Sequence, residues 1–310
     1  MNALAHGAAY AAIVVFLAAV AVRYWRIRNF PLNMRWEIYP IPHEGARSAY
    51  GGSKLEETDW WTKKHAPSRL TELRFMLPEM LLLKALFDHN RRLWWRSFPF
   101  HFGLYLLAAF VALLGLGAGM QLGGIAVDRT ATGMGGVLAM LTIAVGVLGL
   151  AMGWLGAASL LYLRLFDEDL KPYSNPSHYF NLLLIMAVEG LALAAWLWVD
   201  PGFDLCRAFV RDLLTFRISA PAHAGLLDVT VLAAALLVAY IPLTHMSHFF
   251  VKWFTWHHLR WDDSANVRGG RIEVMIQQAL NYPVSWSANH IAGEGKKTWA
   301  QVATEQEAQR

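Results

Sequence analysis

Residues 134–163 read MGGVLAMLTIAVGVLGLAMGWLGAASLLYL and contain no charged side chain. An α-helix rises about 1.5 Å per residue, so about 20 apolar residues cross a hydrocarbon core about 30 Å thick. This run is therefore long enough to form a transmembrane helix. Four other apolar runs of similar length lie at about residues 4–22, 100–119, 179–199 and 224–251. We therefore predict an all-α, polytopic membrane protein, a bundle of five transmembrane helices.

The composition excludes several classes of protein. Of the 310 residues, 56% are hydrophobic and 16% charged, whereas soluble domains have about 25% charged residues. The basic residues lie beside the apolar runs, where membrane topology explains them better than nucleic-acid binding does. Cys206 is the single cysteine. It excludes an internal disulfide, a Cys-x-x-Cys-His haem attachment and any thiolate-bound iron–sulfur cluster built by this chain alone.

The distribution of Lys and Arg predicts the orientation of the spans, because cytoplasmic segments carry the excess. Residues 23–98 hold 14 of them, residues 164–171 hold 2 and residues 252–310 hold 7, out of 27 in the chain. The charge near the first run follows it at Arg23, so we expect this run to be retained rather than cleaved as a signal. We predict an N-terminus outside and a C-terminus in the cytoplasm.

This topology divides the chain into four parts. We predict a first transmembrane helix over 1–25, a cytoplasmic docking segment over 26–98, four transmembrane helices over 99–251, and a cytoplasmic tail over 252–310. Within the docking segment, residues 75–90 are expected to form a short helix with an apolar face, too charged to span the bilayer.

Histidines lie close to the ends of the predicted spans, where ionisable residues are costly and usually face the bundle interior. His101 begins the second span, His178 precedes the fourth, His223 begins the fifth, and His245 and His248 lie near the inner end of the fifth.

On a continuous fifth helix, His223 and His248 would point in nearly the same direction. They are 25 residues apart, which corresponds to roughly 37 Å of rise and a difference of about 20° in direction. Pro242 between them is expected to bend the helix and to weaken this relation.

A b-type haem requires two imidazoles from different helices at the same depth, beside an apolar slot. His101 and His248 meet this requirement, and His245 is an alternative ligand. Gly103 and other small residues in the second span would leave room for a flat cofactor, although helix packing alone also selects them. An interfacial histidine is often only hydrogen-bonded, and we favour that interpretation for His6 and His43.

Two carboxyl groups lie within the spans, Glu189 in the fourth and Asp228 in the fifth. A buried carboxylate is expected to be protonated or paired. Together with His223, these groups are candidates for a path that carries protons between an outer quinone site and the periplasm. For Glu189, the competing interpretation is a hydrogen bond between helices.

The order of these elements resembles the membrane cytochrome b family of the respiratory nitrate reductase gamma subunit. In that family, the second and fifth of five helices ligate the inner haem b. The stretches that match are FPFHFGL at 98–104, which places His101, and YIPLTHMSHFF at 240–250, which places Pro242 and His248.

Further phrases resemble the cytochrome b subunits that work with heterodisulfide-reductase-like iron–sulfur proteins in sulfur metabolism, the membrane subunit linked to dissimilatory sulfite reductase being the most similar. These phrases are RWEIYP at 35–40, GGSKLEE at 51–57, HNRRLWWRSFPFH at 89–101, THMSH at 244–248 and FTWHHLRWDD at 254–263.

The sequence departs from the nitrate reductase pattern at the outer haem. The two ligand positions of that family correspond here to Val111 and Thr230, neither of which replaces an imidazole. We therefore expect one haem b. A second haem would use other ligands, either His223 with His6, or His178.

The resemblance implies a quinone-linked electron-transfer subunit in a bacterial or archaeal cytoplasmic membrane. Electrons would pass between the quinone pool, haem b and a heterodisulfide-reductase-like iron–sulfur partner on the cytoplasmic side, with other membrane or periplasmic subunits alongside. Haem iron would be the only metal. The alternative from another class is a haem-free membrane anchor, or a proton or solute transporter subunit, in which Glu189 and Asp228 line the path.

Overall fold

A computed structural model describes residues 3–29, 58–59, 62, 68–217, 225–259, 268–288, 291–292 and 294–305. These residues are almost entirely helical. Among them, five helices are long and apolar enough to cross a membrane, which confirms the predicted number of spans. They are α1 (Ala3–Arg28), α4 (Arg91–Leu122), α5 (Met134–Phe166), α6 (Pro176–Trp198) and the stretch Gly225–Leu243, which consists of α8 (Gly225–Tyr240) and the 3-10 helix η6 (Ile241–Leu243).

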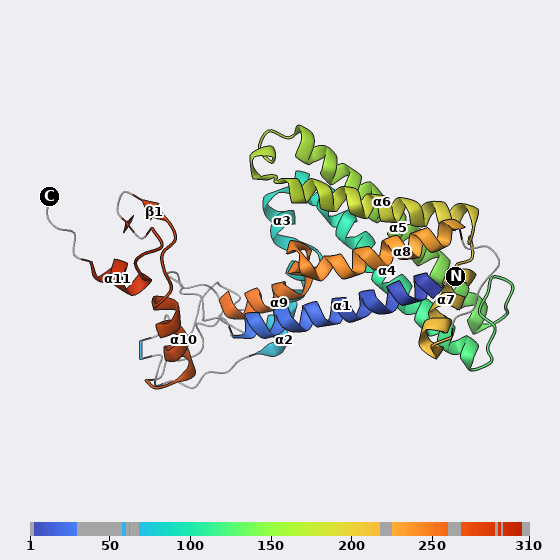
Figure 1. Ribbon diagram of the computed structural model, residues 1–310, viewed down its shortest axis with the longest axis horizontal. Coiled ribbons are helices and arrows are strands. Elements are labelled where there is room, and N and C mark those ends of the chain that lie inside the picture. The colour runs from blue at the N-terminus through green and yellow to red at the C-terminus, as the bar shows by residue number, and fades with distance from the viewer. Residues whose placement is uncertain are drawn as a thin grey trace. The chain divides into compact units, whose positions relative to one another are not determined.

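The chain forms two compact units. The first comprises Met1–Val20 and Leu82–Met246, and the second comprises Ala21–Leu81 and Ser247–Arg310. In the first unit, α4, α5, α6 and α8 are long helices that run alongside one another (Figure 1). This unit also contains three short elements, α3 (Lys84–His89), the 3-10 helix η5 (Lys171–Tyr173) and α7 (Asp204–Thr215).

Glycines bring α4 and α5 into backbone contact. A Cβ atom on Gly103 of α4 would lie 2.7 Å from Cα of Gly153 on α5, which is too close for any side chain. Such small residues drive helix association in lipid, where apolar burial alone does not favour protein over the lipid tails. These glycines therefore allow α4 and α5 to pack backbone to backbone within the first unit.

Two spanning helices begin at asparagine caps. The Asn90 side chain accepts a hydrogen bond from the backbone N–H of Leu93 at 3.0 Å at the start of α4. The Asn175 side chain accepts from the N–H of His178 at 3.3 Å at the start of α6, and Pro176 occupies the first helical position. Both arrangements satisfy backbone donors that a helix N-terminus otherwise leaves exposed.

The fifth helix differs from the continuous run predicted over 224–251. The α-helix ends at Tyr240, and η6 follows with the buried Pro242. Thr244 is extended, and a second 3-10 turn, η7 (His245–Ser247), precedes α9 (His248–Leu259). Proline lacks the N–H that continues a helix, and its ring clashes with the preceding turn. The direction calculated for His248 from His223 therefore does not hold.

The second unit packs the end of α1 with α2 (Arg69–Leu81) and α9. Arg23 donates a hydrogen bond to Oγ of Ser247 at 2.7 Å, and the rings of Tyr24 and Phe254 are in edge contact at 5.3 Å. Lys252 pairs with Glu79 at 2.9 Å. The unit continues with α10 (Arg271–Leu280), an antiparallel ribbon of β1 (Ser287–Ala288) and β2 (Ile291–Ala292), and α11 (Trp299–Thr304).

The single short helix predicted over 75–90 is two helices. α2 ends at Leu81 and α3 begins at Lys84, because Leu83 has a left-handed backbone with φ 54°. A left-handed residue cannot continue a right-handed helix. The phrases at 35–40 and 51–57, together with His43, lie outside the described residues.

Candidate functional site

His101 is held in one tautomer by its own helix. Its Nδ1 atom lies 2.7 Å from the backbone carbonyl oxygen of Ser97, one turn earlier on α4. A carbonyl oxygen only accepts hydrogen bonds, so Nδ1 carries the proton and Nε2 carries the lone pair. Metal-bound histidines commonly have this arrangement, in which the outer N–H is bonded to a carbonyl and the ring is fixed.

His178 has the opposite tautomer. Its Nδ1 accepts a hydrogen bond from the backbone N–H of Asn175 at 3.2 Å and lies 3.3 Å from the guanidinium of Arg164 on α5. Both of these groups are donors, so Nδ1 carries the lone pair and the neutral ring keeps its proton on Nε2. The ring therefore completes the capping box of α6 and does not present a lone pair at Nε2.

A hydrogen-bonded chain connects α8, α6 and η7 at the same end. The Tyr240 hydroxyl donates to Oδ1 of Asn181 at 2.9 Å, and Nδ2 of Asn181 lies 3.3 Å from Nε2 of His245. Because the amide nitrogen is a donor, Nε2 of His245 accepts. The His245 ring is also in edge contact with His178, with centroids 5.2 Å apart.

His101, His178 and His245 therefore lie at one end of the bundle, which we call the histidine end. Phe100, next to His101, packs in one apolar cluster with Leu182 of α6 and Met246 of η7. The structure brings His178 and His245 into direct contact, and it places His101 on the neighbouring helix at this end. An ion pair also lies in this part of the first unit, where Arg92 of α4 pairs with the buried Asp167 at 2.9 Å.

Two further histidines lie on other elements, His248 on α9 and His6 on α1. His248 is the first residue of α9, exposed in the second unit. Its pairing with His101 as a haem ligand therefore stays a prediction from the sequence. His223 lies outside the described residues. His6 on α1 is 1% exposed and packs edge-on against Phe209 of α7 at 4.6 Å.

The two carboxyl groups of the predicted proton path are buried, with Glu189 3% and Asp228 7% exposed. In the described part of the chain, both oxygens of Glu189 and Oδ1 of Asp228 have no hydrogen-bond partner. No hydrogen bond between described residues joins these two groups. The competing interpretation of Glu189, a hydrogen bond between helices, is likewise not supported within that part of the chain.

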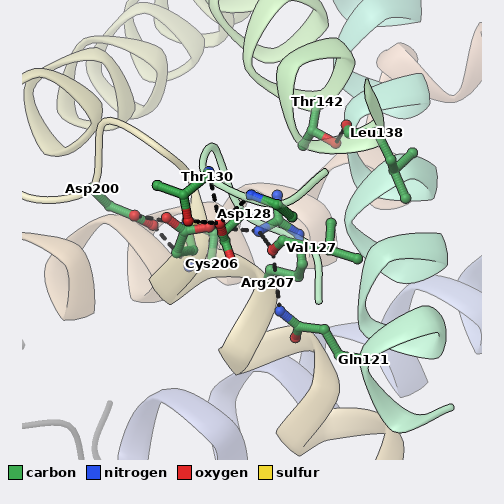
Figure 2. Close-up of polar contacts among 11 residues, drawn as sticks. Gln121, Val127, Asp128, Thr130, Leu138, Thr142, Asp200, Cys206 and Arg207 are labelled. Carbon is green, nitrogen blue, oxygen red and sulfur yellow. Dashed lines mark hydrogen bonds and ion pairs between the residues drawn. The ribbon is translucent and has the colours of Figure 1, made fainter. Parts of the chain in front are cut away.

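The opposite end of the bundle contains a buried arginine that sequence reasoning missed (Figure 2). Arg207 of α7 is fully buried, and its Nη1 donates to the carbonyl oxygen of Val127 at 2.9 Å and to Asp204 at 2.7 Å. A Cβ on Gly117 of α4 would lie 2.8 Å from Nε of Arg207, so the glycine makes room for the guanidinium. The Val127 carbonyl also accepts a hydrogen bond from Gln121 at 3.3 Å.

Two carboxylates order the loops near Arg207. Asp200 accepts hydrogen bonds from the backbone N–H groups of Asp204 at 2.8 Å and Cys206 at 2.9 Å. Burial raises the pKa of the Cys206 thiol, and the Asp200 carboxylate raises it further. Asp128 accepts from the hydroxyl of Thr130 at 2.6 Å and from its N–H, which together lower the pKa of Asp128.

Several residues of the site had weak or no sequence signals. Asn181 and Tyr240 are ordinary polar residues near span ends, although the position of Asn181 three residues after His178 places both on one helix face. Arg207 was visible only as one of four basic residues outside the predicted cytoplasmic segments. Its burial depends on Gly117 and Val127, which are distant in sequence and therefore gave no local signal.

The residues at the histidine end can be compared with the needs of a haem ligand. His101 fits, because its Nδ1–H bond to Ser97 makes Nε2 the nitrogen that would bind iron. His178 and His245 fit less well, because His178 is protonated at Nε2 and Nε2 of His245 already accepts from Asn181. No family model matches the chain, and no curated protein or solved structure matches it.

Proposed function

We propose that this chain is a quinone-linked membrane cytochrome b subunit, with one haem b held between His101 and His248. The observation that carries the proposal is the 2.7 Å contact between Nδ1 of His101 and the Ser97 carbonyl oxygen. It fixes the ring orientation and makes Nε2 basic, as the outer partners of metal-bound histidines do. The sequence resemblance around His101 and His248 points to the same pair.

Haem b would supply reversible one-electron transfer when bound, and the protein would supply axial ligation, burial and control of protons. His101 would orient its Nε2 toward the iron from α4. The apolar cluster around Phe100 and Leu182 would exclude water from this end of the bundle. His178 and His245 would order the helix ends through their hydrogen bonds, and they remain alternatives as ligands of a second haem.

The electron partner would be a heterodisulfide-reductase-like iron–sulfur protein on the cytoplasmic side. The single cysteine supports this division, because thiolate-bound clusters need several cysteines that another subunit must provide. The excess of Lys and Arg in residues 23–98 and 252–310 supports a cytoplasmic location for these segments and an N-terminus outside. The membrane would then be the cytoplasmic membrane of a bacterium or archaeon.

Quinone would be the membrane-soluble redox substrate. Asp228, with His223, remains the candidate set for a quinone or proton site near the start of α8. Asp228 supports this role because its Oδ1 is buried with no hydrogen-bond partner among the described residues. A carboxyl group of this kind is costly in a bilayer, so a functional role is the default expectation.

A second candidate function is a haem-free proton or solute transporter subunit. The observation that favours it is the break at Pro242, because discontinuous helices often mark transporter sites. The buried Glu189 would then belong to the transport path. This candidate requires no bound pigment, and optical spectroscopy therefore separates it from the cytochrome.

The experiment that tests the proposal is quinol-driven reduction of the full-length protein in its native membrane. Adding a soluble quinol should produce b-type absorbance in the wild type. His101→Ala should remove that absorbance, whereas Ser97→Ala should keep it, because the backbone carbonyl of Ser97 remains. Reduction by dithionite but not by quinol would contradict the link to quinone. Equal absorbance in His101→Ala and wild type would contradict the ligand assignment.

A further inference from the structure

Glu189 is buried by the protein itself at the middle of α6. Its side chain is 3% exposed before any lipid is considered, and neither carboxylate oxygen has a hydrogen-bond partner among the described residues. Buried polar groups in folded proteins are normally hydrogen-bonded, and buried charges are normally paired. An unpartnered carboxyl group in this position therefore requires an explanation beyond packing.

The neighbouring helix leaves a slot for this carboxyl group. A Cβ on Gly153 of α5 would lie 2.9 Å from Cδ of Glu189, which is closer than carbon atoms pack. Any side chain larger than hydrogen at position 153 would displace the carboxyl group. The glycine and the glutamate thus form a matched pair across α5 and α6.

The slot lies near the level of His101. Gly103 is two residues after His101 on α4, which is roughly 3 Å along the helix axis. The same Gly103 touches the backbone of Gly153, whose other side meets Glu189. The backbone of Gly153 therefore lies between the Glu189 carboxyl group and α4 at Gly103, two residues after His101.

Few other ionisable groups are available along the helices around Glu189. α5 carries none from Met134 to Leu161. Within the apolar parts of the other spanning helices, the ionisable side chains are His101 and Tyr105 on α4, His178 and Tyr179 on α6, Asp228 and Tyr240 on α8, and His6 and Tyr10 on α1. Toward the helix ends, α4 carries Arg91, Arg92 and Arg96, and α5 carries Tyr162 and Arg164. The short helix α7, which packs against α4, carries Asp204, Cys206, Arg207, Arg211 and Asp212. The Glu189 carboxyl group lies against Gly153 of α5, the residue that contacts Gly103 of α4.

The charge of an added electron would be felt strongly at this position. In a region of low dielectric constant, opposite charges stabilise each other and like charges repel far more than in water. An ionised Glu189 would oppose the arrival of an electron near His101, and a protonated Glu189 would not. Proton binding at Glu189 and electron binding near His101 should therefore favour each other.

We propose that Glu189 is a proton-binding site in the bundle, and that its protonation is coupled to the redox state of the haem that His101 would hold. This inference rests on the proposed haem function. If a haem held by His101 accepted one electron from quinol, the quinol would release a proton to solvent, and the Glu189 carboxylate would take up one proton from solvent, forming an O–H bond. When the electron passed to the iron–sulfur partner, that O–H bond would break and the proton would return to solvent. The net charge of the bundle would thus be the same before and after each electron arrives.

The test is a redox titration of the b-type absorbance of the full-length protein over a range of pH. The midpoint potential of the wild type should fall with rising pH, with a slope that approaches about 59 mV per pH unit for one proton per electron. Glu189→Gln should flatten the slope. Glu168→Gln, a change at an exposed loop carboxyl group, should keep the wild-type slope. Equal slopes in wild type and Glu189→Gln would overturn the inference.

A second readout covers the case in which Glu189→Gln does not fold. Reduced-minus-oxidised infrared spectra should contain the C=O stretch of a carboxylic acid in the wild type. Gly153→Ala should shift or remove this band while leaving every ionisable group in place. An unchanged band in Gly153→Ala would overturn the inference. Absence of b-type absorbance in the wild type would overturn the cytochrome proposal itself, whereas normal absorbance with no dependence on pH would overturn only the role of Glu189.

Discussion

The imidazole of His101 donates from Nδ1 to the backbone carbonyl oxygen of Ser97 over 2.7 Å, within one turn of α4. Because the acceptor is a backbone atom, no side-chain substitution at position 97 removes it. The Ser97 hydroxyl lies farther away, at 3.3 Å from the same nitrogen. The orientation of the ring is thus a property of the helix.

The first prediction distinguishes the role of the His101 imidazole from that of the Ser97 side chain. His101→Ala should lose the b-type absorbance completely, because an alanine offers no ligand to iron. Ser97→Ala should retain wild-type absorbance, because the carbonyl contact survives. Haem extraction, normalised to protein, measures both. A complete loss in Ser97→Ala would mean that the hydroxyl rather than the carbonyl fixes the ring.

The second prediction concerns the chain from Tyr240 through Asn181 to His245. Such bonds between helices in a bilayer contribute about 0.6 kcal/mol on average and at most about 1.7 kcal/mol. Tyr240→Phe and Asn181→Ala should each lower the thermal midpoint, and the double variant should lose less than the sum. A double-mutant cycle of unfolding free energies in detergent measures the coupling. Strict additivity would contradict the 2.9 Å bond between Tyr240 and Asn181.

The third prediction tests the contact between α4 and α5. Gly103→Ala should destabilise the protein by about 1–3 kcal/mol, the usual cost of overpacking, because its Cβ would lie 2.7 Å from Cα of Gly153. Gly115→Ala on the same helix is the matched control, since no atom lies within 4 Å of its Cβ. The thermal midpoints of unfolding of the two variants, compared with the wild type, test this expectation. Equal midpoints would contradict the close approach of the two helices.

These helices also indicate how much the sequence alone could predict. The apolar runs predicted α5 and α6 to within a few residues, because crossing a bilayer requires length and apolar composition, which are local properties. Pro242 marked a bend, but only the structure revealed that α8 ends at Tyr240 and that two 3-10 turns follow. Whether a proline kinks or ends a helix depends on the packing around it.

The candidate site was predictable to a similar degree. The histidines were visible as costly residues near span ends, but their tautomers depend on partners such as Asn175, Arg164 and Asn181. Glu189 was visible as a carboxyl group in a span, whereas its slot at Gly153 requires the register of two helices. Tertiary contacts between distant positions leave no signal in a single sequence.

The fourth prediction concerns the single thiol. Burial, with the Asp200 carboxylate, raises the pKa of Cys206, so its reactive thiolate is scarce at neutral pH. Maleimide should label the folded protein at least about tenfold more slowly than Cys206→Ala/Thr132→Cys, because each unit of pKa lowers the thiolate fraction roughly tenfold. Thr132 is exposed in the loop before α5. Unfolding should abolish the difference, and rapid labelling of the folded wild type would contradict the raised pKa of this thiol.

The fifth prediction is a dependence on pH. The pKa of Asp128 is lowered first by the Thr130 hydroxyl and then by the Thr130 N–H, so the carboxylate stabilises the folded loop. This contribution is fully present above the unfolded value of about 3.9 and is lost as pH falls through the lower folded value. In Asp128→Asn, this part of the fall in the thermal midpoint at acid pH should be absent. Asp169→Asn, in an exposed loop, should behave as the wild type does. Parallel acid profiles for wild type and Asp128→Asn would contradict this role.

The central claim is that the bundle binds haem b through His101. The most direct measurement is a dithionite-reduced minus oxidised spectrum of the purified full-length protein, with haem extracted from the same sample. We predict b-type absorbance bands and one haem per chain, both absent from His101→Ala. A purified, folded wild-type protein without b-type bands would contradict the claim and would favour the haem-free transporter.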